Sequence, residues 1–163
     1  MYPLGHVGLG VHLIPERLRR GLRFRWLALG CLLPDLIDKP WWLATRLLHT
    51  GHRGTRLLGH TLLLCAALGL AARLLRLPAL RAVSLGAFTH AALDVAGEVL
   101  SGMPPIWTGW LLWPLFGWRF PIEATALEPR VPERAIYLAA EAAGFLLLLL
   151  DFVRRRRSRQ SRG

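Results

Sequence analysis

Charged residues are scarce in this 163-residue chain, at 19% of the sequence, whereas hydrophobic residues make up 53% and the mean hydropathy is positive. A soluble domain usually carries about 25% charged residues, so this composition argues against an ordinary water-exposed surface. The only two cysteines, Cys31 and Cys65, lie inside apolar runs and form no CxxC pair. They are therefore interpreted as small buried residues rather than as a disulfide or a zinc knuckle.

Acidic residues are few, and the net charge is +11. The basic residues are nearly all arginine and gather in short blocks between apolar runs, which is typical of the cytoplasmic loops of membrane proteins. We therefore expect no direct nucleic-acid partner. The N-terminus also lacks a charged region and a small-residue cleavage site, so we expect no removable signal peptide.

Apolar segments indicate a membrane protein. Two of them, 57–75 and 135–153, have about the 20 residues that a bilayer span requires, and 79–100 is long enough but more polar. Two shorter apolar stretches, 4–14 and 24–38, would be partial or buried helices. The sequence thus predicts an all-α integral membrane helical bundle of about five membrane-embedded helices. Its single domain would cover 1–153, followed by a basic tail at 154–163.

The arginine blocks predict an orientation. The segments 15–25, 73–81 and 154–163 hold fourteen basic residues, whereas 39–56 and 102–134 hold seven. The positive-inside rule then places the N-terminus outside an inner (plasma) membrane and the tail in the cytoplasm, where it would contact lipid headgroups. Membrane lipids are accordingly expected partners.

Polar residues recur at one depth of this predicted bundle. Counted from the basic loops, His6, Asp35, His60 and His90 fall roughly 14–20 Å above the inner boundary. Asp38 follows Asp35 by three residues, Asp94 follows His90 by four, and Arg56 precedes His60 by four, so each pair would share a helix face.

Such a cluster suits a divalent metal ion. Imidazole and carboxylate ligands favour Zn, Mn or Fe, and six candidates would suffice for one or two ions. The candidate metal ligands are His6, Asp35, Asp38, His60, His90 and Asp94. A metal-activated water would attack a phosphoester or ester, with catalytic roles for Asp38 and for Arg56, which would hold a negatively charged substrate oxygen.

The same residues also allow purely structural interpretations. His6 could hydrogen-bond to a neighbouring helix, and Asp35 and Asp38 could cap a helix or pair with Arg53 and Arg56. His12 would pack near the membrane interface. His49 and His52 form an H-x-x-H that is either solvated or an accessory metal pair. Glu98 and Glu141 are either acids that support the ligands or partners of arginines.

Four motifs in order resemble a known family. They are LLPDLIDKP (32–40), GHRGTRLLGHTLLL (51–64), GAFTHAALDV (86–95) and LLWPLFGWRFP (111–121), after an N-terminal GH. Together they resemble the membrane-bound metal-dependent hydrolase family, whose members are often labelled LexA-binding, inner-membrane-associated hydrolases. The resemblance covers roughly 1–121 and implies a helical bacterial or archaeal membrane protein.

The family's ligand positions carry over to the six candidates named above. Two positions depart from the family pattern: Lys39 stands where a histidine follows the acids, and Thr55 stands where another histidine is common. Such losses would leave fewer metals, or a site that binds metal without turnover.

The predicted metal chemistry points to a small-molecule or lipid phosphoester or ester as substrate. Two other functions stay open from the sequence. One is a non-catalytic membrane protein, a small transporter or partner-binding scaffold, with a hydrogen-bonded His/Asp core. The other is a peripheral helical hydrolase whose apolar helices form an ordinary buried core.

Overall fold

The computed structural model describes residues 2–48, 55–102, 107–120 and 131–160, which fold into helices without a strand. The all-α expectation is confirmed for these residues. The elements are α1 (Pro3–Leu13), α2 (Glu16–Arg19), α3 (Phe24–Leu47), the 3-10 turn η1 (Leu58–His60), α4 (Leu62–Leu74), α5 (Pro78–Leu100), α6 (Trp107–Leu111) and α7 (Val131–Gln160).

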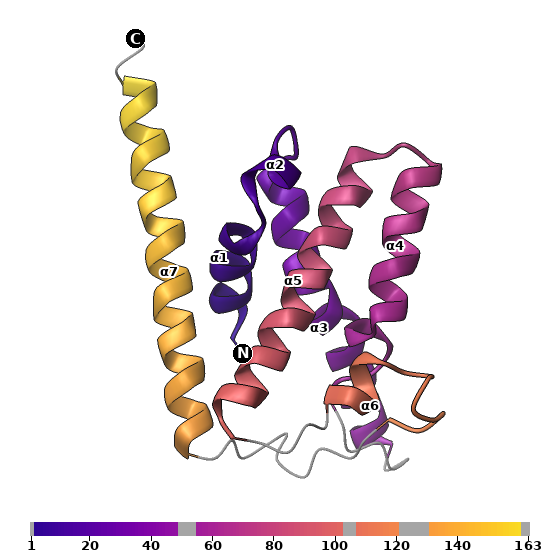
Figure 1. Ribbon diagram of the computed structural model, residues 1–163. Coiled ribbons are helices and arrows are strands. Elements are labelled where there is room, and N and C mark those ends of the chain that lie inside the picture. Colours follow the sequence, from indigo (N-terminus) through magenta and orange to yellow (C-terminus); the bar gives the residue numbers. More distant parts are fainter. Residues whose placement is uncertain (1, 49–54, 103–106, 121–130, 161–163) are drawn as a thin grey trace.

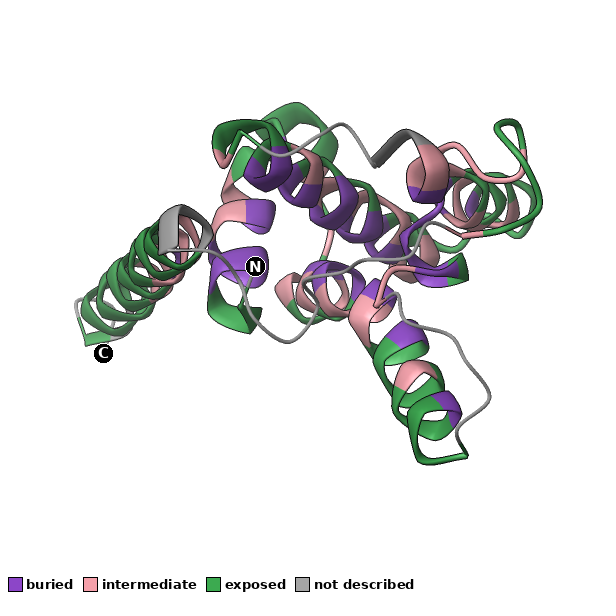
Figure 2. Cartoon of the chain, turned by 90° about the horizontal axis from the view of Figure 1, so that it is seen from below, coloured by how far each residue is buried: buried purple, intermediate pink, exposed green. Residues whose placement is uncertain are grey.

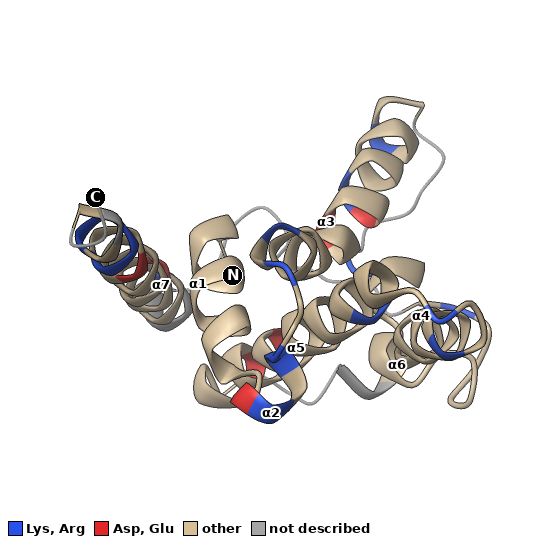
Figure 3. Cartoon of the chain, turned by 90° about the horizontal axis from the view of Figure 1, so that it is seen from above, with Lys and Arg blue, Asp and Glu red and all other residues tan. Residues whose placement is uncertain are grey.

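The long helices α3 and α5 form the centre and pack most extensively against each other. Helix α1 lies against both, α4 packs on α5, and α7 packs mainly on α1 (Figure 1). Helix α2, the α4–α5 connection and the C-terminal end of α7 lie at the same end of the bundle. Viewed from that end, the ribbon is coloured for Lys and Arg residues on all three (Figure 3), so the three arginine blocks share one end of the molecule.

Small residues set the two closest helix contacts. Gly30 of α3 and Gly86 of α5 face each other, and a Cβ at either would overlap backbone atoms of the opposite helix. Gly8 of α1 and Gly144 of α7 meet in the same way. Helix backbones approach this closely when no side chain intervenes. The contact between Gly30 and Gly86 holds α5 close enough to α3 for polar side chains of the two helices to meet.

One helix in the described residues is long and apolar enough to cross a membrane, with a 25-residue segment at Arg134–Ser158. Few residues of this apolar segment are buried, in agreement with the largely green ribbon of α7 in Figure 2. The predicted span 57–75 was wrong as a single helix. Thr61 is extended, and its side chain accepts a hydrogen bond from Leu64 N–H, so α4 begins only at Leu62 and has 13 residues. That about five helices are embedded in the membrane stays a prediction.

Helix α3 is longer than the apolar stretch 24–38. It continues to Leu47 through two internal prolines, Pro34 and Pro40. Asp35 and Asp38 therefore lie in the middle of a helix rather than at its end. Beyond Pro40 the helix is largely exposed, with Trp41 59% and Leu47 71% accessible.

Candidate metal centre

Five of the predicted ligands meet in the interior of the bundle. They come from three helices and the 3-10 turn: His6 from α1, Asp35 from α3, His60 from η1, and His90 and Asp94 from α5. The three histidines and Asp94 are almost completely buried, whereas Asp35 is intermediate. Two groups of these residues have ligand atoms close enough to hold a metal ion: His6, His90 and Asp94, and Asp35, His60 and His90.

The Asp38 carboxylate contacts the Nδ1 side of the His60 ring and is not one of the ligand atoms that face each other in the cluster. Its Oδ2 accepts hydrogen bonds from His60 Nδ1 and from the backbone N–H of Leu57, both at 2.7 Å. Its Oδ1 accepts one from Gly59 N–H at 2.8 Å. Asp38 therefore fixes the η1 turn to α3 and sets the orientation of the His60 ring. A carboxylate behind a histidine is a common supporting contact in metal sites.

His90 is held in a similar way. Its Nδ1 donates a hydrogen bond to the carbonyl oxygen of Cys31 at 2.7 Å. A carbonyl can only accept, so the proton of a neutral His90 ring lies on Nδ1 and the lone pair on Nε2. The same reasoning, with the Asp38 carboxylate as acceptor, leaves the lone pair of a neutral His60 on Nε2.

The two lone-pair positions face each other. The Nε2 atoms of His60 and His90 lie 3.1 Å apart. Asp94 Oδ2 is 3.5 Å from His60 Nε2 and 3.7 Å from His90 Nε2, and Asp35 Oδ1 is 3.6 Å from His60 Nε2. Two nitrogen lone pairs repel each other at this distance. A cation between the two atoms, either a shared proton or a metal ion, would remove that repulsion.

His6 completes the cluster from the side of α1. Its ring stacks on that of His90, with centroids 3.7 Å apart and planes 11° apart. Its Nε2 lies 3.4 Å from Asp94 Oδ1. Its Nδ1 is buried and has no hydrogen-bond partner among the described residues. A buried nitrogen left without a partner costs free energy, and a ligand is one way to remove that cost.

Arg56 supplies a fixed positive charge. Its Nε donates to Asp94 Oδ2 and its Nη1 to Glu98 Oε1, both at 2.9 Å. The guanidinium lies over the ring of Trp110, 5.3 Å from its centroid. Trp110, fully buried on α6, donates from Nε1 to Glu98 Oε1 at 3.2 Å and meets the His60 ring edge to face. Thus α6 covers the side of the cluster formed by Arg56, His60 and Glu98.

Several sequence-based expectations differ in detail. Arg56 and His60 do not share a helix face, because Arg56 precedes η1 and only Leu58–His60 is helical there. Lys39, which replaces a family histidine, forms a 2.6 Å ion pair with Asp35. The expectation that Asp35 pairs with Arg53 concerns a residue outside the described part, as do His49 and His52.

Two residues around the cluster were not predicted as part of the site. Glu98 is predicted from the sequence as an acid that supports the ligands or as a partner of an arginine, but not as a ligand; here it pairs with Arg56, and its position one turn beyond Asp94 on α5 is the available signal. Nothing in the sequence pattern distinguished Trp110 from the other tryptophans. Glu141 instead contacts α1, where it accepts hydrogen bonds from Leu4 N–H and Gly5 N–H.

The comparison with protein families covers nearly the whole chain. The model described as "YdjM inner membrane protein" matches residues 1–158. The chain belongs to the YdjM inner membrane protein family. Searches of curated proteins and of solved structures found no match. The YdjM description names a membrane location and no reaction, so the hydrolase activity suggested by the motifs remains a prediction.

Proposed function

We propose that this YdjM family chain is a membrane-bound, divalent-metal-dependent hydrolase that cleaves a phosphoester or ester. The observation that carries the proposal is the 3.1 Å separation of the His60 and His90 Nε2 atoms, with both Nδ1 atoms already bound to oxygen. Such preset ring orientations direct two nitrogen lone pairs at one point, as a metal site requires.

The distances around that point fit a single ion. Ligand atoms about 2.0–2.1 Å from a tetrahedral zinc ion lie about 3.3–3.4 Å from one another. The separations of His60 Nε2 from the His90, Asp94 and Asp35 atoms, and of His90 Nε2 from Asp94 Oδ2, are 3.1–3.7 Å. His90 has only Nε2 available, so the two groups of candidate ligands would share one ion more readily than hold two.

The supporting residues have separate roles in this proposal. Asp38 is a positioning residue, because its oxygens hold η1 and the His60 ring rather than face the cluster. Arg56, although paired with Asp94 and Glu98, keeps a positive charge beside the ligands, where it would attract an anionic substrate oxygen. Trp110 shields this side of the cluster from water. A bound divalent metal would supply an activated water and polarise the substrate.

Metal analysis of the purified protein tests the proposal. We expect about one equivalent of Zn, Mn or Fe per chain in the wild type and a loss of that metal in His60→Ala. His12→Ala is the matched control, because His12 bonds to Gly8 O and approaches Asp151, away from the cluster. A metal-free wild type that cannot be loaded with Zn, Mn or Fe would overturn the metal site.

Activity is tested on the same preparations with phosphodiester, phosphomonoester and carboxyl ester substrates. Turnover that disappears in His60→Ala and persists in His12→Ala supports the hydrolase. Metal binding without turnover of any of these substrates would instead favour a non-catalytic scaffold with a polar core. The ion pairs of Arg56 with Asp94 and Glu98 are the feature that supports this second candidate.

A further inference from the structure

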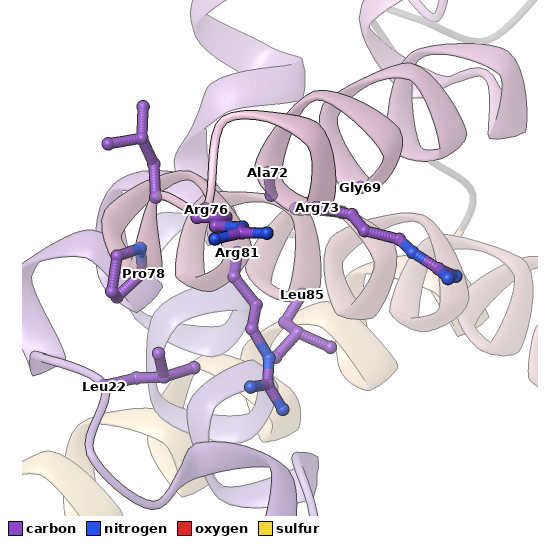
Figure 4. A pocket seen from close by; sticks show the side chains of 10 residues that line it. Leu22, Gly69, Ala72, Arg73, Arg76, Pro78, Arg81 and Leu85 are labelled. Atoms are coloured by element: carbon purple, nitrogen blue, oxygen red, sulfur yellow. The ribbon is translucent and has the colours of Figure 1, made fainter.

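A second site lies at the arginine-rich end of the bundle, where α4 turns into α5. A pocket of about 550 Å³ is bounded there by the end of α4, the start of α5 and Leu22 from the α2–α3 connection (Figure 4). Three of its lining residues are arginines, namely Arg73, Arg76 and Arg81, and no acidic residue lines it. All three arginines are exposed, and none forms an ion pair with a described residue.

The other walls of this pocket are apolar. They comprise Leu22, Ala72, Leu77, Pro78 and Leu85, with Gly69 and Ser84 between α4 and α5. Farther along α4, Leu63 and Leu70 are 52% and 59% exposed, so α4 also presents apolar side chains outside the pocket. A pocket that combines arginines with apolar walls suits an amphiphile with a negatively charged head.

The backbone at Arg76 provides an independent reason to assign a role to this turn. Arg76 has a φ of 53°, in the left-handed region, at the position after a helix end where glycine is favoured. Leu77 N–H bonds to Ala72 O at 3.2 Å and Leu75 N–H to Ala71 O at 2.9 Å, which closes the turn around it. An arginine in this conformation is strained, and backbone strain of this kind clusters at functional sites.

The start of α5 adds to the positive potential of the pocket. Leu77, its N-cap, makes no side-chain capping hydrogen bond, and Pro78 occupies the first helical position. The positive end of a 23-residue helix therefore faces the region of Arg76 and Arg81, and such ends favour phosphate groups.

We infer that this pocket binds the phosphate headgroup of an anionic phospholipid, with an acyl chain lying along α4. The arginines would contact the phosphate oxygens, and the apolar wall favours a lipid over free phosphate. A second pocket near α7, which also contains arginines, includes Asp151 and so has a less uniform charge. This inference is independent of the metal centre.

The test measures lipid retained by the detergent-purified full chain, using native mass spectrometry and dioleoyl phosphatidylglycerol as the probe. We expect wild type to retain about tenfold more phosphatidylglycerol than phosphatidylcholine. The combined variant Arg73→Gln, Arg76→Gln, Arg81→Gln should fall to the phosphatidylcholine level. The matched control, Arg17→Gln, Arg20→Gln, Arg156→Gln, removes the same charge from exposed positions outside the pocket and should retain the lipid.

Two single variants separate binding from folding. Arg76→Gly relieves the left-handed strain, so the melting temperature should hold or rise while lipid retention falls. Gly69→Leu fills the pocket without a change of charge, since even a Cβ there lies 3.2 Å from Ser84 Oγ, and should also reduce retention. Equal retention by the pocket and control variants would overturn the site. Wild-type retention of phosphatidylglycerol no greater than that of phosphatidylcholine would overturn an anionic lipid as its ligand.

Discussion

The carboxylate of Asp38 accepts a hydrogen bond from Nδ1 of His60 across 2.7 Å, between the middle of α3 and a three-residue turn. Both residues are almost completely buried. The same carboxylate also accepts hydrogen bonds from two backbone N–H groups at that turn, so Asp38 fixes both the His60 ring nitrogen and the backbone that carries the ring. The hydrogen bond at Nδ1 of His60 therefore directs its Nε2 toward His90.

This relationship predicts the effect of Asp38→Asn. The amide keeps the shape but loses the charge and one acceptor, so we expect a 10- to 100-fold weaker affinity for zinc, about the usual cost of removing such a supporting carboxylate. Competition with a chelator measures the affinity. Asp151→Asn, at the far end of α7, is the control and should leave it unchanged. An unaltered affinity in Asp38→Asn would remove its positioning role.

Trp110→Ala should destabilise the fold and expose the cluster. The ring is fully buried between Arg56 and His60, so its loss leaves a cavity and removes one of the hydrogen bonds to Glu98, at a cost of about 3–5 kcal/mol. Denaturant unfolding followed by fluorescence gives the change in free energy. Trp118→Ala provides the comparison, because Trp118 is 79% exposed and should contribute little. Similar unfolding of the two variants would contradict the covering role of α6.

Glu141→Gln should weaken the attachment of α1 to α7. The two carboxylate oxygens accept from Gly5 N–H at 2.6 Å and from Leu4 N–H at 3.1 Å, whereas a glutamine side chain offers one oxygen. We expect a loss of about 1–3 kcal/mol in thermal unfolding and weaker metal retention, since α1 carries His6. Glu16→Gln, exposed at the start of α2, should change neither quantity. Unchanged unfolding in Glu141→Gln would show that the contact is dispensable.

The predicted orientation can be tested by cysteine labelling in intact cells. The native Cys31 and Cys65 are buried, so a membrane-impermeant reagent should not reach them. We expect Leu115→Cys, at a residue 82% exposed near α6, to react from outside, and Ser158→Cys in the arginine tail to stay protected. The reverse labelling pattern would invert the topology. Release of the protein by alkaline carbonate would instead support a peripheral attachment.

Helix positions followed closely from the sequence where an apolar run had clear limits. The segments 79–100 and 135–153 became α5 and α7, because a long apolar run with a proline or a charged block at its end has few other solutions. The segment 57–75 failed because Thr61 stops the chain from continuing as one helix just after His60. Propensity in the leucine-rich run gave no sign of that local hydrogen bond.

The candidate ligands were also predictable as a set, since buried histidines and acids in apolar helices require partners. The contacts that each of these residues makes were not predictable. Asp35 and Asp38 are three residues apart on α3, yet one faces Lys39 and the cluster while the other faces η1. Helical spacing places both on one face and says nothing about which neighbour each one meets.

By itself, the sequence determined that this chain is helical, apolar and arginine-rich at particular loops, and that its few buried histidines and acids would need each other. These properties follow from composition and short-range periodicity. Only the tertiary structure decided that the Nε2 atoms of His60 and His90 face one another, that Arg56 pairs with Asp94 and Glu98, and that Trp110 covers them. Those contacts join residues from different helices, and their geometry depends on where glycines allow the helices to touch.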